Sequence, residues 1–142
     1  MTRGQYPSTR MRRNRMKAFS RRLVAETRLD TADLVWPLFV VEGNNITQPI
    51  AAMPGVSRYS IDRLLDQAAT AVRLTIPAIA IFPSIEASLK DDEGSLACDG
   101  DNLVCRAVRA VKAAHPDLGI VCDVALDPFT THGHDGLFDD DK

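Results

Sequence analysis

Three short apolar runs, separated by two helical patterns, constrain the fold of this chain more than any other feature. The runs begin near residues 34, 78 and 119, so each run and the helix after it take about 42 residues. Strands that alternate with helices in this way are typical of parallel sheets with right-handed crossover connections. The sequence therefore predicts an α/β fold.

The three runs cover residues 34–41, 77–83 and 119–125, and most of their positions are apolar. Continuous apolar strands indicate burial on both faces, as in parallel sheets. Pro37 has no N–H to donate to a neighbouring strand. The first strand is therefore expected to be interrupted there or to lie at an edge.

Two helices are expected between the runs. The first has one apolar stripe at helical spacing, with Ser60 as its N-cap. The stripe consists of Ile61, Leu64, Leu65, Ala68, Ala69 and Val72. The second helix covers about 102–114 and ends before Pro116. The segments before these helices, 42–59 and 84–101, are predicted as long loops.

Loops at the carboxyl ends of parallel strands hold the functional sites of α/β folds. The densest polar group of the chain follows the third run and consists of Asp123, Asp127, His132, His134 and Asp135. Asp123 is expected within the strand and Asp127 just past its end. Carboxylates there can bind a hard cation such as Mg²⁺, polarise water or hold an ammonium group. The alternative is that these aspartates only cap turns.

The other reactive side chains give weaker signals. His132 and His134 are too small a set for zinc, which takes three or four ligands. Cys122 is expected to pack on the side of the strand away from Asp123, as a reduced thiol. Lys90 is the one lysine with a route to a pocket, because the others lie in a basic arm, on a helix and at the last position.

Charge is distributed unevenly along the chain. Residues 1–28 carry nine basic side chains and one acidic one, a net charge of +8, which leaves −10 for the remainder. This segment is expected to be an extended arm, helical near 19–26, that binds RNA, a neighbouring subunit or the chain's own acidic body. No window of 18 apolar residues occurs, and no apolar segment follows the basic start. We therefore expect a cytoplasmic protein without a membrane span.

Length sets a further expectation. A (β/α)8 barrel with this repeat needs on the order of 340 residues, whereas the chain has 142. We therefore expect the chain to be the first part of a longer protein. The alternative is a small three-stranded α/β domain, although its sheet edges would be exposed.

Six segments match one enzyme family in order and spacing. They are DVALDPFTTHGHDG at 123–136, WPLFV at 36–40, MPGV at 53–56, IPA at 76–78, RAVRA at 106–110 and RMRRN at 10–14. With these segments the sequence resembles porphobilinogen synthase, which is also called delta-aminolevulinic acid dehydratase.

The resemblance implies a (β/α)8 barrel, of which residues 29–142 would supply the first three strands and the start of the active-site lid. It implies that the arm, residues 1–28, wraps a neighbouring subunit in a homo-octamer. The arm residues concerned are Arg10, Arg12 and Arg13. The family condenses two molecules of 5-aminolevulinate into porphobilinogen, a step of tetrapyrrole and haem biosynthesis. Two lysines form Schiff bases with the substrates and would lie beyond Lys142, so this chain alone is expected to be inactive.

The resemblance also assigns the polar loop. Zinc-dependent members have cysteines where this sequence has Ala125, Asp127 and Asp135. The aspartate-rich form implies magnesium in place of zinc, since carboxylates prefer hard ions, with Asp127 and Asp135 as candidate ligands. Asp123 and Asp135 are implied in the substrate pocket. The lid would begin with Phe129, Thr130, Thr131, His132, Gly133 and His134.

The sequence departs from the family pattern at Thr75, where glycine is usual, and at 95–99, where SLACD replaces a commoner SEAYN. Two other hypotheses stay open. One is a non-enzymatic module whose arm binds RNA with an affinity that falls steeply with salt. Nucleic acid is the less favoured partner, because the chain has no recognisable RNA-binding motif. The other is a short paralogue that assembles with full-length subunits through its arm.

Overall fold

The computed structural model describes residues 4–10 and 12–136. Contacts divide the chain into two compact units, Met1–Asp30 and Thr31–Lys142. Lys142, beyond which the Schiff-base lysines are expected, lies outside the described residues. No helix among the described residues is long and apolar enough to cross a membrane.

The first unit contains two short helices, α1 (Arg13–Met16) and α2 (Ala18–Leu23). The sequence predicted one helix near 19–26, and this expectation was wrong in its bounds. Neither helix buries a residue or has a side-chain cap on its first turn. Short helices without tertiary packing do not extend far, so α2 ends three residues before the expected position.

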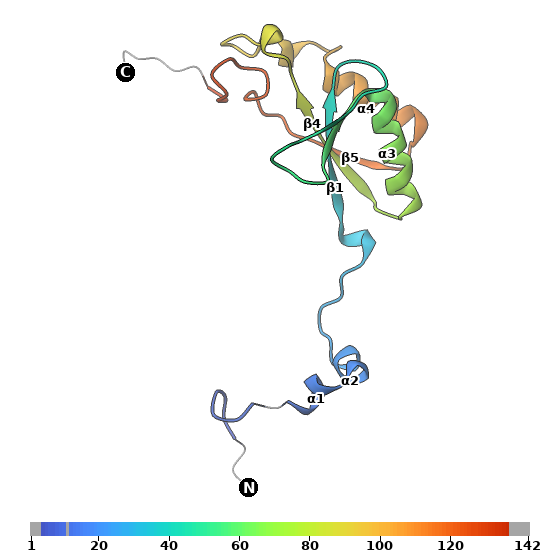
Figure 1. The fold of residues 1–142 in the computed structure, drawn as a ribbon, viewed down its shortest axis with the longest axis vertical. Coiled ribbons are helices and arrows are strands. Elements are labelled where there is room, and N and C mark those ends of the chain that lie inside the picture. Colours follow the sequence, from blue (N-terminus) through green and yellow to red (C-terminus); the bar gives the residue numbers. More distant parts are fainter. Residues whose placement is uncertain (1–3, 11, 137–142) are drawn as a thin grey trace, which may run out of the picture. The chain divides into compact units, whose positions relative to one another are not determined.

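The second unit contains a five-stranded sheet in the order β2-β3-β1-β4-β5 (Figure 1). Its strands are β1 (Val35–Val41), β2 (Thr47–Pro49), β3 (Ser57–Tyr59), β4 (Ala78–Ser84) and β5 (Gly119–Cys122). β1 pairs with β4, and β4 with β5, in parallel. The α/β fold with a parallel sheet is thereby confirmed.

The sheet corrects two expectations. The predicted loop 42–59 contains the antiparallel pair β2 and β3. Each of these strands has three residues, too few to show a two-residue period. β5 ends at Cys122, so Asp123 lies just past the strand and not within it.

Pro37 lies inside β1, which is uninterrupted and lies between β3 and β4, so the expected interruption is absent and an edge exists only locally, at the level of Pro37. Along one side of β1, Pro37 is opposite Ala80 of β4. On the other side, β3 pairs with β1 only at Phe39 and Val40. At the level of Pro37, no strand among the described residues pairs with β1 on the β3 side, so the missing N–H of Pro37 breaks no hydrogen bond there.

Helices α3 (Ile61–Arg73) and α4 (Leu103–Ala114) confirm the two predicted helices, and both pack on one face of the sheet (Figure 1). Ser60 precedes α3 as expected, but its hydroxyl accepts a hydrogen bond from the Ile46 N–H at 2.8 Å. Asn102 caps α4 by accepting from the Cys105 N–H at 2.9 Å. Among the described residues, three short 3₁₀ helices complete the unit, at Thr31–Asp33, Ala87–Leu89 and Ser95–Cys98.

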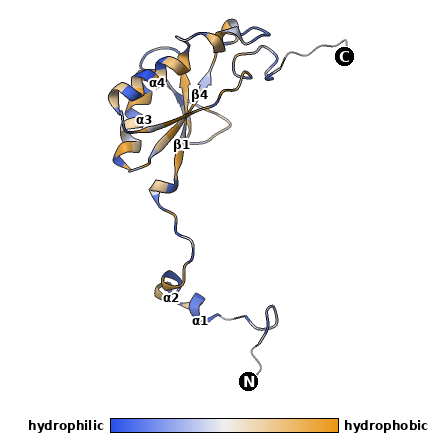
Figure 2. Cartoon of the chain, turned by 180° about the vertical axis from the view of Figure 1, so that it is seen from behind, coloured by the Kyte–Doolittle hydropathy of each residue, from blue (hydrophilic) through white to orange (hydrophobic). Residues whose placement is uncertain are grey.

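The hydrophobic core lies between the sheet and these two helices. Its members include Leu38, Val40, Leu64, Ala68, Ala71, Ile79, Ile81, Leu103, Ala107, Val111 and Leu118. Side chains alternate along a strand, so Phe39 and Phe82 lie on the opposite face, with ring centroids 5.8 Å apart. Figure 2 shows β1 as predominantly hydrophobic and α1 as hydrophilic, in line with their different packing.

Candidate functional site

Two loops leave the sheet at the same edge. β4 and β5 are parallel neighbours, with Ala78 opposite Gly119 and Ile81 opposite Cys122. Residues 85–101, here called the β4 loop, and residues 123–136, here called the β5 loop, therefore both follow the carboxyl ends of their strands. This edge is where α/β proteins bind their ligands.

Asp135 closes the β5 loop on itself. Its Oδ1 atom accepts hydrogen bonds from the N–H groups of Leu126 and Asp127, at 2.7 and 3.0 Å. The Phe129 N–H donates to the Leu126 carbonyl at 2.8 Å, which forms a tight turn. A carboxylate that accepts two backbone N–H groups holds them in one orientation. Asp135 therefore sets the conformation of the loop that carries it.

The expected lid residues fall into a buried part and an exposed part. Phe129 and Thr130 are buried, whereas the residues from Thr131 to His134 are exposed. The Thr130 hydroxyl donates to the His134 carbonyl at 3.0 Å. The rings of His132 and His134 stack with centroids 5.9 Å apart.

The β4 loop contacts the β5 loop directly. Asp91 and Thr130 form an isolated parallel bridge, and the Thr131 N–H donates to the Asp91 carbonyl at 3.0 Å. The Thr131 hydroxyl donates to the Asp92 carboxylate, and His132 Nε2 lies 3.1 Å from the Asp92 carbonyl oxygen. This contact could not be predicted from the sequence, because Asp92 and Thr131 are 39 residues apart and no local pattern connects them.

The turn that makes this contact is itself capped. Asp91 Oδ1 accepts from the Ser95 N–H at 2.9 Å. The pKa of Asp91 is lowered, chiefly by this backbone hydrogen bond and next by the Ser95 hydroxyl. The carboxylate therefore stays ionised at neutral pH and keeps the turn closed.

The predicted site residues are brought together only in part. Asp123 and Asp127 are both exposed on the β5 loop, and Asp135 turns one oxygen towards the backbone. The described residues contain no group of three or more His, Cys, Asp or Glu side chains that gathers as a metal site. The carboxylates thus share one loop without enclosing a complete coordination sphere in this part of the chain.

Cys122 corrects another expectation, since it is exposed instead of packed. It lies opposite Ile81 on the helix-facing side of the sheet. The pKa of its thiol is raised, chiefly because the sulfur is partly withdrawn from water, and also by the nearby Cys105. A raised thiol pKa lowers its nucleophilicity at neutral pH.

Lys90 and Lys112 do not lie on strands. Lys90 follows a 3₁₀ helix in the β4 loop and is half-buried. Lys112 Nζ donates to the carbonyls of Pro116 and Leu118, at 3.1 and 2.6 Å, and so ties down the end of α4. These hydrogen bonds give Lys112 a structural role at the end of α4.

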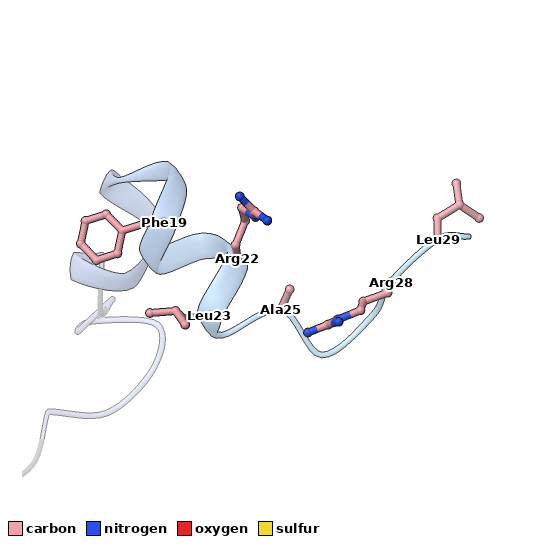
Figure 3. A pocket seen from close by; sticks show the side chains of 6 residues that line it. All are labelled: Phe19, Arg22, Leu23, Ala25, Arg28 and Leu29. Carbon is pink, nitrogen blue, oxygen red and sulfur yellow. The ribbon is translucent and has the colours of Figure 1, made fainter. Parts of the chain in front are cut away.

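The first unit presents apolar side chains to its surroundings. A hollow of about 680 Å³ is lined by Phe19, Arg22, Leu23, Ala25, Arg28 and Leu29 (Figure 3). Phe19 is 67% exposed, Leu23 80% and Leu29 83%. The arginines expected to contact a neighbour, Arg12 and Arg13, are exposed, as is Arg10, which lies over the Tyr6 ring with 5.7 Å to the ring centroid.

The parallel sheet covered by helices, with a carboxylate-rich loop after β5, places this chain in the class of α/β proteins that bind ligands at the carboxyl ends of their strands. Comparison with known sequences narrows it: the sequence model of the delta-aminolevulinic acid dehydratase family matches residues 8–142. The chain belongs to the delta-aminolevulinic acid dehydratase family.

Individual relatives agree with this assignment. The delta-aminolevulinic acid dehydratase of Bradyrhizobium diazoefficiens is 56% identical over 131 residues, which are 92% of this chain and 37% of that protein. The Chlamydia pneumoniae enzyme is 45% identical over 131 residues, 92% of this chain and 40% of that protein. The chain thus spans well under half the length of these relatives.

A solved structure shows the same fold. The crystal structure of delta-aminolevulinic acid dehydratase from Toxoplasma gondii, in complex with its reaction product porphobilinogen, matches with a TM-score of 0.88 and 38% identity. The match covers 94% of this chain and 38% of that one. The sheet and helices described above are consistent with part of the barrel of that family.

Proposed function

We propose that the protein to which this chain belongs is a porphobilinogen synthase, a hydro-lyase that condenses two molecules of 5-aminolevulinate. The observation that carries this proposal is the carboxylate-rich β5 loop at the carboxyl edge of a sheet shared with the dehydratase family. In the complete protein, we propose, the sheet continues into a (β/α)8 barrel. The parallel order β1-β4-β5, with a helix between successive strands, supports this, because it is the repeat from which such a barrel is built.

The exposed Asp123 is the proposed substrate contact. Its carboxylate follows β5 at the edge where a ligand would enter, and it is exposed. At neutral pH 5-aminolevulinate carries an ammonium group, which a carboxylate attracts and orients. Asp135 would act beside it by keeping the loop in one conformation, through its hydrogen bonds to Leu126 and Asp127.

Magnesium is the proposed metal. Asp127 offers an exposed carboxylate, and Asp135 has one oxygen beyond the Oδ1 atom that the backbone occupies. Mg²⁺ is commonly held by one or two carboxylates with water in its remaining positions, so two such donors fit it. The β5 loop has no cysteine among residues 123–136, which makes it a poor donor set for zinc. When bound, the ion would supply positive charge that stabilises developing negative charge on the substrate.

The amine nucleophiles are proposed to lie beyond Lys142. Lys112 is occupied at the end of α4, and Lys90 lies in a loop instead of an apolar strand. A Schiff-base lysine needs an environment that lowers its pKa, such as a desolvated position. We propose accordingly that residues 1–142 alone do not form porphobilinogen.

The arm is proposed to dock on a second copy of the chain within an octamer. Support comes from the exposed Phe19, Leu23 and Leu29, since large apolar side chains on one short segment favour burial by a partner. Replacing Phe19 by Asp should reduce the oligomer mass in sedimentation experiments. An unchanged mass would contradict this role of the arm.

The test of function uses the protein expressed from its native gene. We expect porphobilinogen to form from 5-aminolevulinate, to decrease when EDTA is added and to recover with Mg²⁺. Borohydride should trap substrate adducts on lysines outside residues 1–142, as located by peptide mass. Absence of product with either Mg²⁺ or Zn²⁺ would refute the function, and an adduct on Lys90 would refute the proposed position of the nucleophiles.

A further inference from the structure

The β5 loop is held by the β4 loop at three successive residues. Thr130 bridges to Asp91, the Thr131 N–H donates to the Asp91 carbonyl at 3.0 Å, and the Thr131 hydroxyl donates to the Asp92 carboxylate. His132 adds a ring contact to the Asp92 carbonyl at 3.1 Å. Backbone and side-chain contacts in register along two segments restrict both sliding and rotation.

Gly94 allows the two loops to approach closely. It is buried and has φ +65°, in the left-handed region that favours glycine. A Cβ atom at this position would lie 3.3 Å from Thr130 Cγ2 and 3.6 Å from Phe129 Cβ. Phe129 and Thr130 are the two buried residues of the lid segment. The glycine therefore lies beneath the part of the β5 loop that is packed.

The hydrogen bonds of the His132 ring also assign its tautomer. Its Nδ1 atom accepts a hydrogen bond from the His134 N–H at 3.2 Å. A neutral imidazole that accepts at Nδ1 carries its proton on Nε2. Nε2 therefore donates to the Asp92 carbonyl. Displacement of the β4 loop would remove the acceptor that holds this tautomer.

We propose that the turn Asp91–Ser95 positions the catalytic loop of this enzyme, with Asp92 as its positioning residue. The turn would set where Asp127 and Asp135 stand relative to the substrate, without touching the substrate itself. For its activity readout this inference rests on the proposed function. Its structural readout, amide hydrogen exchange, does not.

The first experiment compares Gly94→Ala with Gly100→Ala in the protein expressed from its native gene. Gly100 lies in the same loop, and a Cβ atom added to it would meet no other atom within 4 Å, so it is a matched control. Gly94→Ala should accelerate exchange of the Thr131 amide by about tenfold, the effect of left-handed strain on an L residue, and lower kcat/KM for porphobilinogen formation by a similar factor. Gly100→Ala should leave both unchanged.

The second experiment separates positioning from general stability. Asp92→Ala and Thr131→Val each remove the side-chain hydrogen bond, whereas Asp92→Asn and Thr131→Ser each keep an acceptor or a donor. The first pair should lower kcat and shift the His132 ring ¹⁵N signals away from the Nε2–H tautomer. The second pair should restore both towards the unsubstituted protein.

The outcomes distinguish this inference from the proposed function. Unchanged Thr131 exchange in Gly94→Ala would refute the loop contact whatever the enzyme does. Faster exchange with unchanged kcat and KM would refute the positioning role while leaving the activity in place. A protein that makes no porphobilinogen but shows the expected exchange would refute the proposed function and the catalytic part of this inference, and would leave the loop contact standing.

Discussion

Replacement of Asp135 tests how the β5 loop is built. Asp135 Oδ1 accepts two hydrogen bonds, at 2.7 Å from the Leu126 N–H and at 3.0 Å from the Asp127 N–H. A hydrogen bond to a charged acceptor contributes about 1.5–3 kcal/mol when buried. Asp135 is exposed, so solvent reduces this to about 1 kcal/mol for each bond.

Asp135→Ala should therefore lower the free energy of local loop opening by about 2 kcal/mol, the sum of the two bonds. A change of 1.4 kcal/mol is tenfold in an equilibrium constant, so exchange of the Leu126 and Asp127 amides should become about 30-fold faster. Asp135→Asn keeps the Oδ1 acceptor but loses the charge, and should give about a fivefold increase, half the free-energy loss.

Residue-resolved hydrogen exchange measured by NMR is the assay. Amides of β4, such as that of Ile81, serve as the internal reference, because Ile81 is buried in the core and no hydrogen bond of Asp135 reaches β4 among the described residues. Unchanged exchange at Leu126 and Asp127 in Asp135→Ala would show that Asp135 does not hold the loop. Equal acceleration at Ile81 would show global destabilisation instead of opening of the loop.

Three further predictions concern residues at the ends of α3 and α4. Thr75 has φ +58°, so Thr75→Gly should be more stable than Thr75→Ala by about 1 kcal/mol in urea unfolding, and the reverse order would contradict the strain. The pKa of Asp62 is lowered, chiefly by the Ser60 hydroxyl. A carboxylate whose pKa is lower in the folded state stabilises the fold above about pH 4, and this contribution is lost as the pH falls. Asp62→Asn should therefore reduce the loss of unfolding free energy at acid pH, measured by urea denaturation at several pH values. An unchanged dependence on pH would exclude Asp62 as its source. Asn102→Ala removes the cap of α4 and should lower the free energy of unfolding by about 1 kcal/mol, measured by urea denaturation, whereas Asn102→Asp should retain most of it.

Local pattern explains which parts of the fold the sequence predicted well. α3 and α4 each have an apolar stripe that repeats over about three turns, β1 is apolar along its seven residues, and β4 is apolar along its first six. These signals persist over enough positions to define an element. β2 and β3 have three residues each, and no period is visible at that length.

The parallel α/β fold, the family and the segment that carries the carboxylates could all be predicted from the sequence, because each follows from short residue patterns and their order along the chain. Only the tertiary structure decided that Asp135 turns to its own backbone and that Asp92 contacts Thr131. The latter pair is 39 residues apart, and it meets because β4 and β5 are parallel neighbours whose loops leave at one edge. The register of the strands and the geometry of the loops decide which side chains face each other there, and a local sequence pattern determines neither of them.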